Sequence, residues 1–265
     1  MARMIIAGDA FNVEAEGDAQ RPALMLSNSL GTDIGMWDAQ MPALLQHFRV
    51  VRYDSRGHGK SVADRRPISM AQLGRDALAI MDALGLEKVH WMGVSKGGMV
   101  GQWLLTHAGA RIGRCVLANT SSHMPGLDGW NARIAAVHAG GMAAVTPAVL
   151  ARWFTPGFLA RAPETMARIA AMLHATPPQG YANCCAAIRD MDQRESIRGV
   201  AHDVLVIVGA HDPATPPEHG ALLAVSIKGA RLLSLEAAHL SNIEDEAGFT
   251  RAVVDYLTAA PGRAR

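Results

Sequence analysis

Short apolar runs alternate with stretches of helical spacing along most of this chain. Residues 23–26 form a continuous apolar run typical of a strand covered on both faces, whereas residues 11–16 alternate apolar and polar side chains like a half-buried edge strand. Other apolar runs predict strands at residues 48–53, 89–92, 114–118, 204–208 and 232–235. Helical spacing predicts helices over residues 70–84 and 99–105, and near 218–226 and 248–257. This alternation indicates an α/β fold with a mostly parallel, doubly wound sheet.

One long segment, residues 121–198, breaks the alternation. It contains no convincing strand but several helical stretches, with prolines at positions 125, 147, 156, 163, 177 and 178. We interpret it as a helical lid over the strand ends. We therefore expect a single domain, with a core of residues 1–120 and 199–265. The lid of residues 121–198 is inserted after the strand that follows the 99–105 helix.

A serine lies between glycines where the predicted strand 89–92 leads into the predicted helix 99–105. The sequence Gly93-Val94-Ser95-Lys96-Gly97 fits the Gly-x-Ser-x-Gly pattern of a nucleophile elbow, a strained turn that exposes its serine. Side chains two residues before and after that serine would collide where strand and helix cross, and glycine removes them. A Gly/Ser-rich loop without catalytic function is the alternative, since so short a pattern recurs by chance. The flanking strand and helix favour Ser95 as a nucleophile.

A nucleophilic serine needs a base within hydrogen-bond reach, itself oriented by an acid. Among 11 histidines, His239 directly follows the last predicted strand, and ligands of open α/β sheets are met at such strand ends. The alternative is a histidine in a surface loop. His58, His211 and His219 also lie in predicted loops, but none of them follows the last strand. Position therefore favours His239 as the base.

The candidate acid is Asp212. It follows the predicted strand 204–208 and precedes a helix, although an aspartate before proline also suits a turn or a helix cap. The loop after the preceding strand reads Asn119-Thr120-Ser121 and offers no carboxylate. This absence favours Asp212, which would hold the His239 imidazole in the right tautomer and stabilise its cation.

Acyl transfer also needs hydrogen-bond donors aimed at the developing oxyanion. We expect the backbone N–H of Lys96, directly after the nucleophile, and that of Leu30, in the loop after strand 23–26. Many hydrolases carry His-Gly ahead of this second donor, and Asn28 and Ser29 stand in those places here. Lys96 occupies a position where many such enzymes carry methionine or another apolar residue, and the sequence leaves the role of its side chain open.

Motifs spread over residues 26–244 carry a family resemblance. The segment Ser27-Asn28-Ser29-Leu30-Gly31-Thr32-Asp33, with Met36-Trp37-Asp38, resembles the oxyanion loop of 3-oxoadipate enol-lactonases of the α/β-hydrolase superfamily. The order serine, acid, histidine is also that of α/β hydrolases. Asp54-Ser55-Arg56-Gly57-His58-Gly59 is common to many members of the superfamily. Further matches, several of them in the lid, lie at residues 152–156, 180–182, 184–185, 187–190, 215–217 and 237–242.

The resemblance implies the α/β-hydrolase fold and a cofactor-free activity. This activity is hydrolysis of 3-oxoadipate enol-lactone to 3-oxoadipate, through an acyl-enzyme on Ser95, in the β-ketoadipate pathway of protocatechuate and catechol degradation. A general carboxylesterase and a perhydrolase-type haloperoxidase are alternatives on the same core. A binding protein that has kept the fold as a receptor is an alternative of another class.

The implied lactone carries a free carboxylate, which a cation should meet. Arg133, Arg152 and Arg189 in the lid are candidates, and a solvated helix face or an ion pair within the lid is the alternative for each. Trp130 and Trp153 are candidate apolar walls, and Asn28 and Ser29 are candidate polar contacts.

Composition limits the remaining possibilities. The formal net charge is +1 with both signs well mixed, so a nucleic-acid partner is not expected. The N-terminus lacks the features of a secretory signal, and no apolar run approaches the roughly 18 residues of a membrane span. Three cysteines, two of them the adjacent Cys184 and Cys185, fit a reducing compartment and packed thiols better than a disulfide or zinc site. We expect a cytoplasmic protein without a bound metal. The sequence does not distinguish a monomer from a homo-oligomer.

Overall fold

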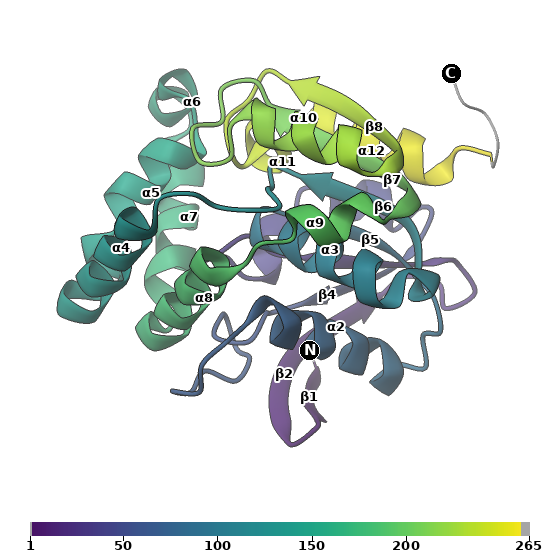
Figure 1. Ribbon diagram of the computed structural model, residues 1–265, viewed down its shortest axis with the longest axis horizontal. Coiled ribbons are helices and arrows are strands. Elements are labelled where there is room, and N and C mark those ends of the chain that lie inside the picture. Colours follow the sequence, from purple (N-terminus) through teal and green to yellow (C-terminus); the bar gives the residue numbers. More distant parts are fainter. Residues whose placement is uncertain (1, 261–265) are drawn as a thin grey trace.

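A computed structural model of the chain describes residues 2–260, and within them one sheet runs through the molecule (Figure 1). The sheet has eight strands in the order β1-β2-β4-β3-β5-β6-β7-β8. β1 and β2 are antiparallel to their neighbours, and the six strands β3 to β8 are parallel to one another. The strands are β1 (Ala2–Ile6), β2 (Asp9–Glu16), β3 (Ala23–Ser27), β4 (Arg49–Tyr53), β5 (Val89–Val94), β6 (Ile112–Ala118), β7 (Ala201–Gly209) and β8 (Lys228–Leu235).

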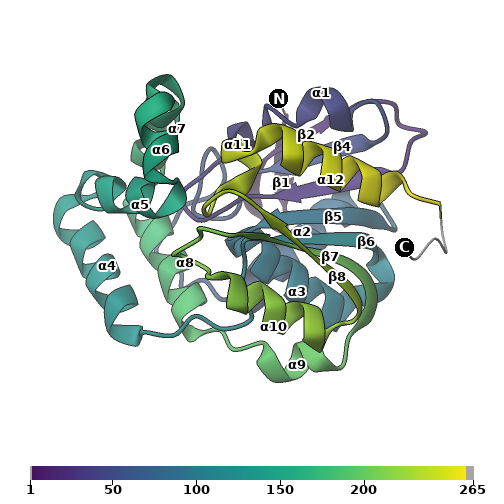
Figure 2. The ribbon, with the colours of Figure 1, turned by 90° about the horizontal axis from the view of Figure 1, so that it is seen from above.

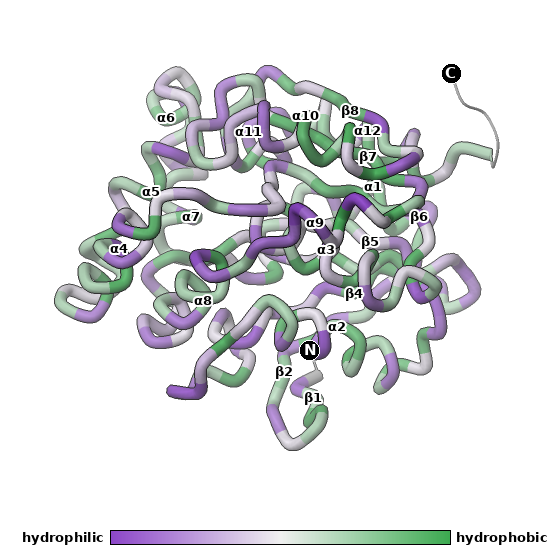
Figure 3. Tube along the Cα trace, in the orientation of Figure 1, coloured by the Kyte–Doolittle hydropathy of each residue, from purple (hydrophilic) through white to green (hydrophobic). Residues whose placement is uncertain are grey.

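Helices cover both faces of this sheet, as the prediction of a doubly wound sheet requires. Figure 2 shows α1 and α12 on one side of the strands and α3 and α10 on the other. The central strand β3 is buried at every position, and Figure 3 shows hydrophobic residues along β7 in the sheet. The core helices are α1 (Met41–Leu44), α2 (Met70–Ala83), α3 (Lys96–Ala108), α10 (Pro217–Ser226), α11 (Ser241–Glu244) and α12 (Glu246–Thr258).

Six α-helices lie between β6 and β7 in the part of the chain that the structure describes. They are α4 (Leu127–Gly140), α5 (Thr146–Trp153), α6 (Pro156–Arg161), α7 (Pro163–Ala175), α8 (Pro178–Asp190) and α9 (Arg194–Arg198). Those from α4 to α8 stand beyond one end of the sheet (Figures 1 and 2). α9 instead packs on α3 and α10 of the core. The position of these helices suits the lid expected for residues 121–198.

The N-terminal strand β1 was not expected from the sequence. It pairs with β2 through a tight turn at Ala7 and Gly8, both with positive φ (51° and 86°). Ile5 in this strand is 71 % exposed, so the strand lacks the buried apolar run by which the others were recognised.

A buried arginine ties this N-terminal edge to the core. Arg56, in the segment after β4, donates two hydrogen bonds of 2.8 Å to the Asp76 carboxylate on α2. It donates a third, of 2.7 Å, to Asp9 at the start of β2. Bidentate pairing satisfies a planar guanidinium that would otherwise be costly to bury, and it fixes the turn after β4.

Candidate active site

The turn between β5 and α3 has the geometry of a nucleophile elbow. Ser95 takes φ = 56° and ψ = −115°, a conformation that residues with a side chain rarely adopt. A Cβ on Gly93 would lie 2.2 Å from the Gly97 carbonyl, and one on Gly97 would lie 2.0 Å from the Ser27 oxygen on β3. Glycine is therefore required at both positions, for the reason predicted from the sequence. The helix begins directly at Lys96.

Asp212 and His239 come together from the loops after β7 and β8. Nδ1 of His239 lies 2.8 Å from Oδ2 of Asp212, and both side chains are buried. Burial opposes ionisation of the aspartate, but the charge and hydrogen bond of His239, with two bonds from Thr215, lower its pKa below the ordinary value. The carboxylate is therefore ionised at neutral pH and fixes the imidazole with Nε2 directed away from it.

Two residues that the sequence argument did not select complete this pair. Thr215 donates to Asp212 from both its hydroxyl (2.7 Å) and its backbone N–H (2.9 Å). Asn119, with φ = 45°, donates to Asp212 Oδ2 and to the Ala238 carbonyl, each at 3.1 Å. The loop 119–121, which offered no acid, thus supplies an amide that holds the acid and the histidine loop together.

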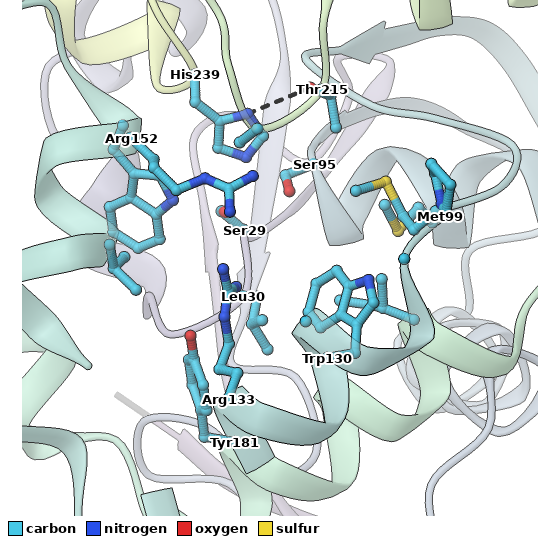
Figure 4. A pocket seen from close by; sticks show the side chains of 18 residues that line it. Ser29, Leu30, Ser95, Met99, Trp130, Arg133, Arg152, Tyr181, Thr215 and His239 are labelled. Carbon is cyan, nitrogen blue, oxygen red and sulfur yellow. Dashed lines mark hydrogen bonds between the residues drawn. The ribbon is translucent and has the colours of Figure 1, made fainter. Parts of the chain in front are cut away.

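Ser95 and His239 open on the same cavity, whose volume is about 290 Å³ (Figure 4). Figure 4 shows the His239 imidazole between Thr215 and the Arg152 side chain, with the Ser95 hydroxyl facing the cavity. Its walls combine loops of the core with helices from between β6 and β7, so a ligand there would contact both. The other labelled residues of the lining are Ser29, Leu30, Met99, Trp130, Arg133, Arg152, Tyr181 and Thr215.

The two backbone amides expected to stabilise an oxyanion are available. Within residues 2–260, neither the Leu30 N–H nor the Lys96 N–H donates to another protein group. The N–H of Lys96 belongs to the first turn of α3, where backbone donors have no partner in the helix. The neighbouring Gly31 N–H is occupied, because it donates to Nε2 of His58 at 2.8 Å.

Two residues expected at the ligand lie elsewhere. Asn28 is fully buried, accepts from the Trp37 indole at 2.8 Å and donates to the Tyr53 carbonyl at 3.0 Å. Arg189 pairs with Asp190 through two hydrogen bonds and with Asn131 through a third. Neither lines the cavity. Both expectations are corrected: Asn28 supports the loop, and Arg189 forms the lid ion pair that was its alternative interpretation.

The Lys96 side chain does not approach the cavity either. It is fully buried, and its Nζ has no hydrogen-bond partner within the described chain. Burial lowers its pKa from the usual value of 10.5, against the opposing influence of Cys184 and Asp54. His58 is also fully buried, and this burial, together with the charge of the nearby Lys96, lowers the pKa of its imidazole well below the ordinary value. His58 is therefore neutral and can accept the Gly31 N–H.

Comparison with known proteins places this architecture. The model of a family described as "alpha/beta hydrolase fold" matches residues 22–246. The chain belongs to the α/β-hydrolase fold family. The fold expected from the motifs is confirmed by this match and by the mostly parallel eight-stranded sheet.

Among α/β hydrolases, the chain is similar to enol-lactonases. It is 38% identical to 3-oxoadipate enol-lactonase 2 of Acinetobacter baylyi over 92% of its own length and 91% of the relative. The crystal structure of the enol-lactonase from Burkholderia xenovorans LB400 matches 97% of this chain and 100% of that one, with a TM-score of 0.96 and 40% identity. A hydrolase from Pseudomonas aeruginosa PA01 matches with a TM-score of 0.94 and 45% identity, over 97% and 98% of the two chains. The family resemblance inferred from the motifs is confirmed, and with it the expectation of an enzyme of the lactone-hydrolase type.

Among residues 2–260, no group of three or more histidine, cysteine or acidic side chains could hold a metal ion. Across the same residues, no helix combines the length and the apolar character needed to cross a bilayer. Cys115, Cys184 and Cys185 are free and buried, and burial raises the pKa of Cys184 to about 11.

Proposed function

We propose that this chain hydrolyses 3-oxoadipate enol-lactone to 3-oxoadipate. The observation that carries the proposal is the shared cavity. It brings Ser95 and the Asp212–His239 pair together with two backbone amides and a lid arginine. Within the described part of the chain, neither amide donates a hydrogen bond and the arginine has no acidic partner. The names of the similar enol-lactonases support the choice of substrate.

In the proposed mechanism the Ser95 hydroxyl attacks the lactone carbonyl while its proton passes to Nε2 of His239. Asp212, hydrogen-bonded at Nδ1, stabilises the resulting imidazolium. The carbonyl oxygen becomes an oxyanion between the N–H groups of Leu30 and Lys96. The ring C–O bond then breaks, and the electron pair leaves on the enol oxygen. The His239 imidazolium gives up its proton to the leaving enolate, whose protonation at carbon yields the ketone, and His239 is neutral again for the next step.

The acyl-enzyme formed in this step carries the ring-opened chain as an ester on Ser95. Water attacks that ester with His239 as general base, the bond to Oγ breaks, and the proton returns to the serine. The net reaction is addition of one water molecule, which yields a dicarboxylate. Neither a cofactor nor a redox partner takes part.

Arg133 is the residue proposed to hold the carboxylate of the lactone. Its guanidinium lies 4.9 Å from the centre of the Trp130 ring and, in Figure 4, beside Tyr181. It forms no ion pair with any residue of the described chain, although it is partly buried. Ser29 adds a buried hydroxyl at the cavity wall that has no hydrogen-bond partner among residues 2–260. Arg152 and Trp153 also line the cavity, but Arg152 is exposed at its mouth.

The test compares two arginine variants on the enol-lactone. Arg133→Gln should raise KM roughly 10-fold or more, since a hydrogen bond to a charged group contributes about 1.5–3 kcal/mol. Arg189→Gln is the matched control, because its guanidinium faces Asp190 rather than the cavity, and its kinetics should stay within about twofold of wild type. Equal KM values for wild type and Arg133→Gln would assign the carboxylate to another group.

The substrate assignment is tested separately by turnover. kcat/KM for the enol-lactone should exceed that for 4-nitrophenyl acetate by several orders of magnitude. Comparable values would instead favour a general carboxylesterase. On the proposed assignment the enzyme acts in the cytoplasm within the β-ketoadipate pathway, on a small lactone that bears a carboxylate. The helices of residues 121–198 then serve as its lid.

A further inference from the structure

Each proposed oxyanion donor belongs to a peptide group whose carbonyl is bonded on the opposite side. In a trans peptide, the N–H of one residue and the C=O of the preceding residue point in opposite directions within one plane. The Leu30 N–H is therefore oriented by whatever holds the Ser29 carbonyl, and the Lys96 N–H by whatever holds the Ser95 carbonyl. A threonine hydroxyl contacts each of these carbonyls.

Thr120 holds the elbow peptide. Its hydroxyl donates to the Ser95 carbonyl at 2.7 Å, and its side chain is buried. Gly98 leaves room for this side chain, because a Cβ there would lie 2.7 Å from three Thr120 side-chain atoms. The Ser95 carbonyl also accepts the helical N–H of Met99 at 3.0 Å. It would therefore remain satisfied without the threonine hydroxyl, and an isosteric replacement should fold.

Thr32 holds the other peptide in a similar way. Its hydroxyl donates to the Ser29 carbonyl at 3.0 Å, and the side chain is fully buried. The Thr32 N–H approaches the same carbonyl at a longer distance, 3.4 Å. The same Oγ1 is 3.0 Å from the Met36 sulfur, which is a weak acceptor, so the hydroxyl proton goes to the carbonyl.

We propose that Thr32 and Thr120 are positioning residues for the oxyanion donors. The inference rests on the proposed function of Ser95 and of the Leu30 and Lys96 amides. Each hydroxyl fixes the plane of one peptide, so that its N–H faces the cavity before the substrate arrives. Each also polarises that peptide, because hydrogen bonds in a chain strengthen one another. Preorganised donors stabilise charge without reorganisation at the moment of reaction.

The test removes each hydroxyl while keeping the shape of the side chain. Thr120→Val and Thr32→Val should each lower kcat roughly 10-fold, a part of the roughly 100- to 1,000-fold cost of losing an oxyanion donor outright. KM should change less than about twofold, because the bond matters once the oxyanion forms. Thr120→Ser and Thr32→Ser keep the hydroxyl and should recover most of the lost kcat.

The matched control is Thr146→Val. Thr146 is also buried and donates to a backbone carbonyl, that of Met142, at 2.8 Å, but the carbonyl lies in the lid, outside the cavity lining. Its removal should affect stability without lowering kcat. The concentration of competent sites is measured for every variant from the 4-nitrophenol burst, so that partial unfolding is not counted as a loss of kcat.

The assays use both the enol-lactone and 4-nitrophenyl acetate. A kcat equal to wild type in either folded valine variant, an equal loss in Thr146→Val, or a loss confined to KM would overturn the inference. If one valine variant does not fold, the other with its serine partner decides the outcome. Failure of the enol-lactone alone, with the same pattern kept on 4-nitrophenyl acetate, would refute the proposed substrate and leave the positioning residues standing.

Discussion

Replacing Lys96 by methionine should stabilise the protein. The lysine side chain is fully buried, and its Nζ lacks a hydrogen-bond partner within residues 2–260. Cys184 and Asp54 favour its charged form, but burial outweighs them and lowers the pKa of the amine. Methionine is as flexible but one atom shorter, so its apolar methyl group ends where the lysine Cε lies and the amine is removed, while the backbone N–H of residue 96 stays in place.

The size of the gain follows from the unpaired donor. An unsatisfied buried polar group costs about 1–3 kcal/mol, and more when it is charged. Lys96→Met should therefore raise the free energy of unfolding by about 1–3 kcal/mol at pH 7. For a domain of this size, each kcal/mol raises Tm by about 2–4 °C. Because folding lowers the pKa of this amine, the unfolded chain binds more protons, so the lysine's penalty is full at low pH and declines as the pH rises toward 10.5.

The assay is urea unfolding of both proteins at pH 7 and at pH 9.5. The advantage of Lys96→Met should be larger at pH 7. Lys88→Met is the control, since Lys88 is exposed and its replacement should change stability by less than about 0.5 kcal/mol. A destabilised Lys96→Met variant, or an advantage that grows with pH, would refute the view that this ammonium group is buried without compensation.

Two further replacements test the elbow and the acid. Gly97→Ala should prevent folding or cost at least about 3 kcal/mol, because the new Cβ would lie 2.0 Å from the Ser27 oxygen; a well-expressed variant with unchanged Tm would contradict the tight crossing of β5 and α3. Asp212→Asn should keep the fold but lower kcat roughly 10,000-fold, because an amide no longer selects the required His239 tautomer; retention of a tenth of the wild-type kcat would assign the acid to another residue.

The residues predicted for catalysis could be found because short local patterns in the sequence mark their positions in the fold. Glycine spacing around Ser95 reflects a steric need of the strand–helix crossing itself. Asp212 and His239 follow strands whose apolar runs are readable, and parallel strands bring their carboxyl ends to one edge of the sheet. The helical segment between β6 and β7 could be recognised as a break in the alternation for a similar reason, since its helices lack the buried apolar runs of the sheet strands.

The features that were missed depend on contacts between distant segments. Asn119 was considered only as a site for an acid, yet it donates to Asp212, which lies 93 residues away. Strand β1 is held by its pairing with β2 rather than by burial. Strand β8 begins at Lys228, before the predicted start at residue 232, and its first half is largely exposed, so it has no buried apolar run to mark it in the sequence. Nothing in the sequence distinguished Arg133, which lines the cavity, from Arg189, whose charge Asp190 neutralises.

The central claim is that Ser95 opens an enol-lactone ring through an acyl-enzyme. Its most direct test is the initial rate of 3-oxoadipate enol-lactone hydrolysis by the wild type and by Ser95→Ala, with Tm measured for both. We expect rapid turnover by the wild type and a loss of nearly all activity in a variant with an unchanged Tm. Wild-type-like turnover by folded Ser95→Ala, or no turnover of the lactone by the wild type, would contradict the claim.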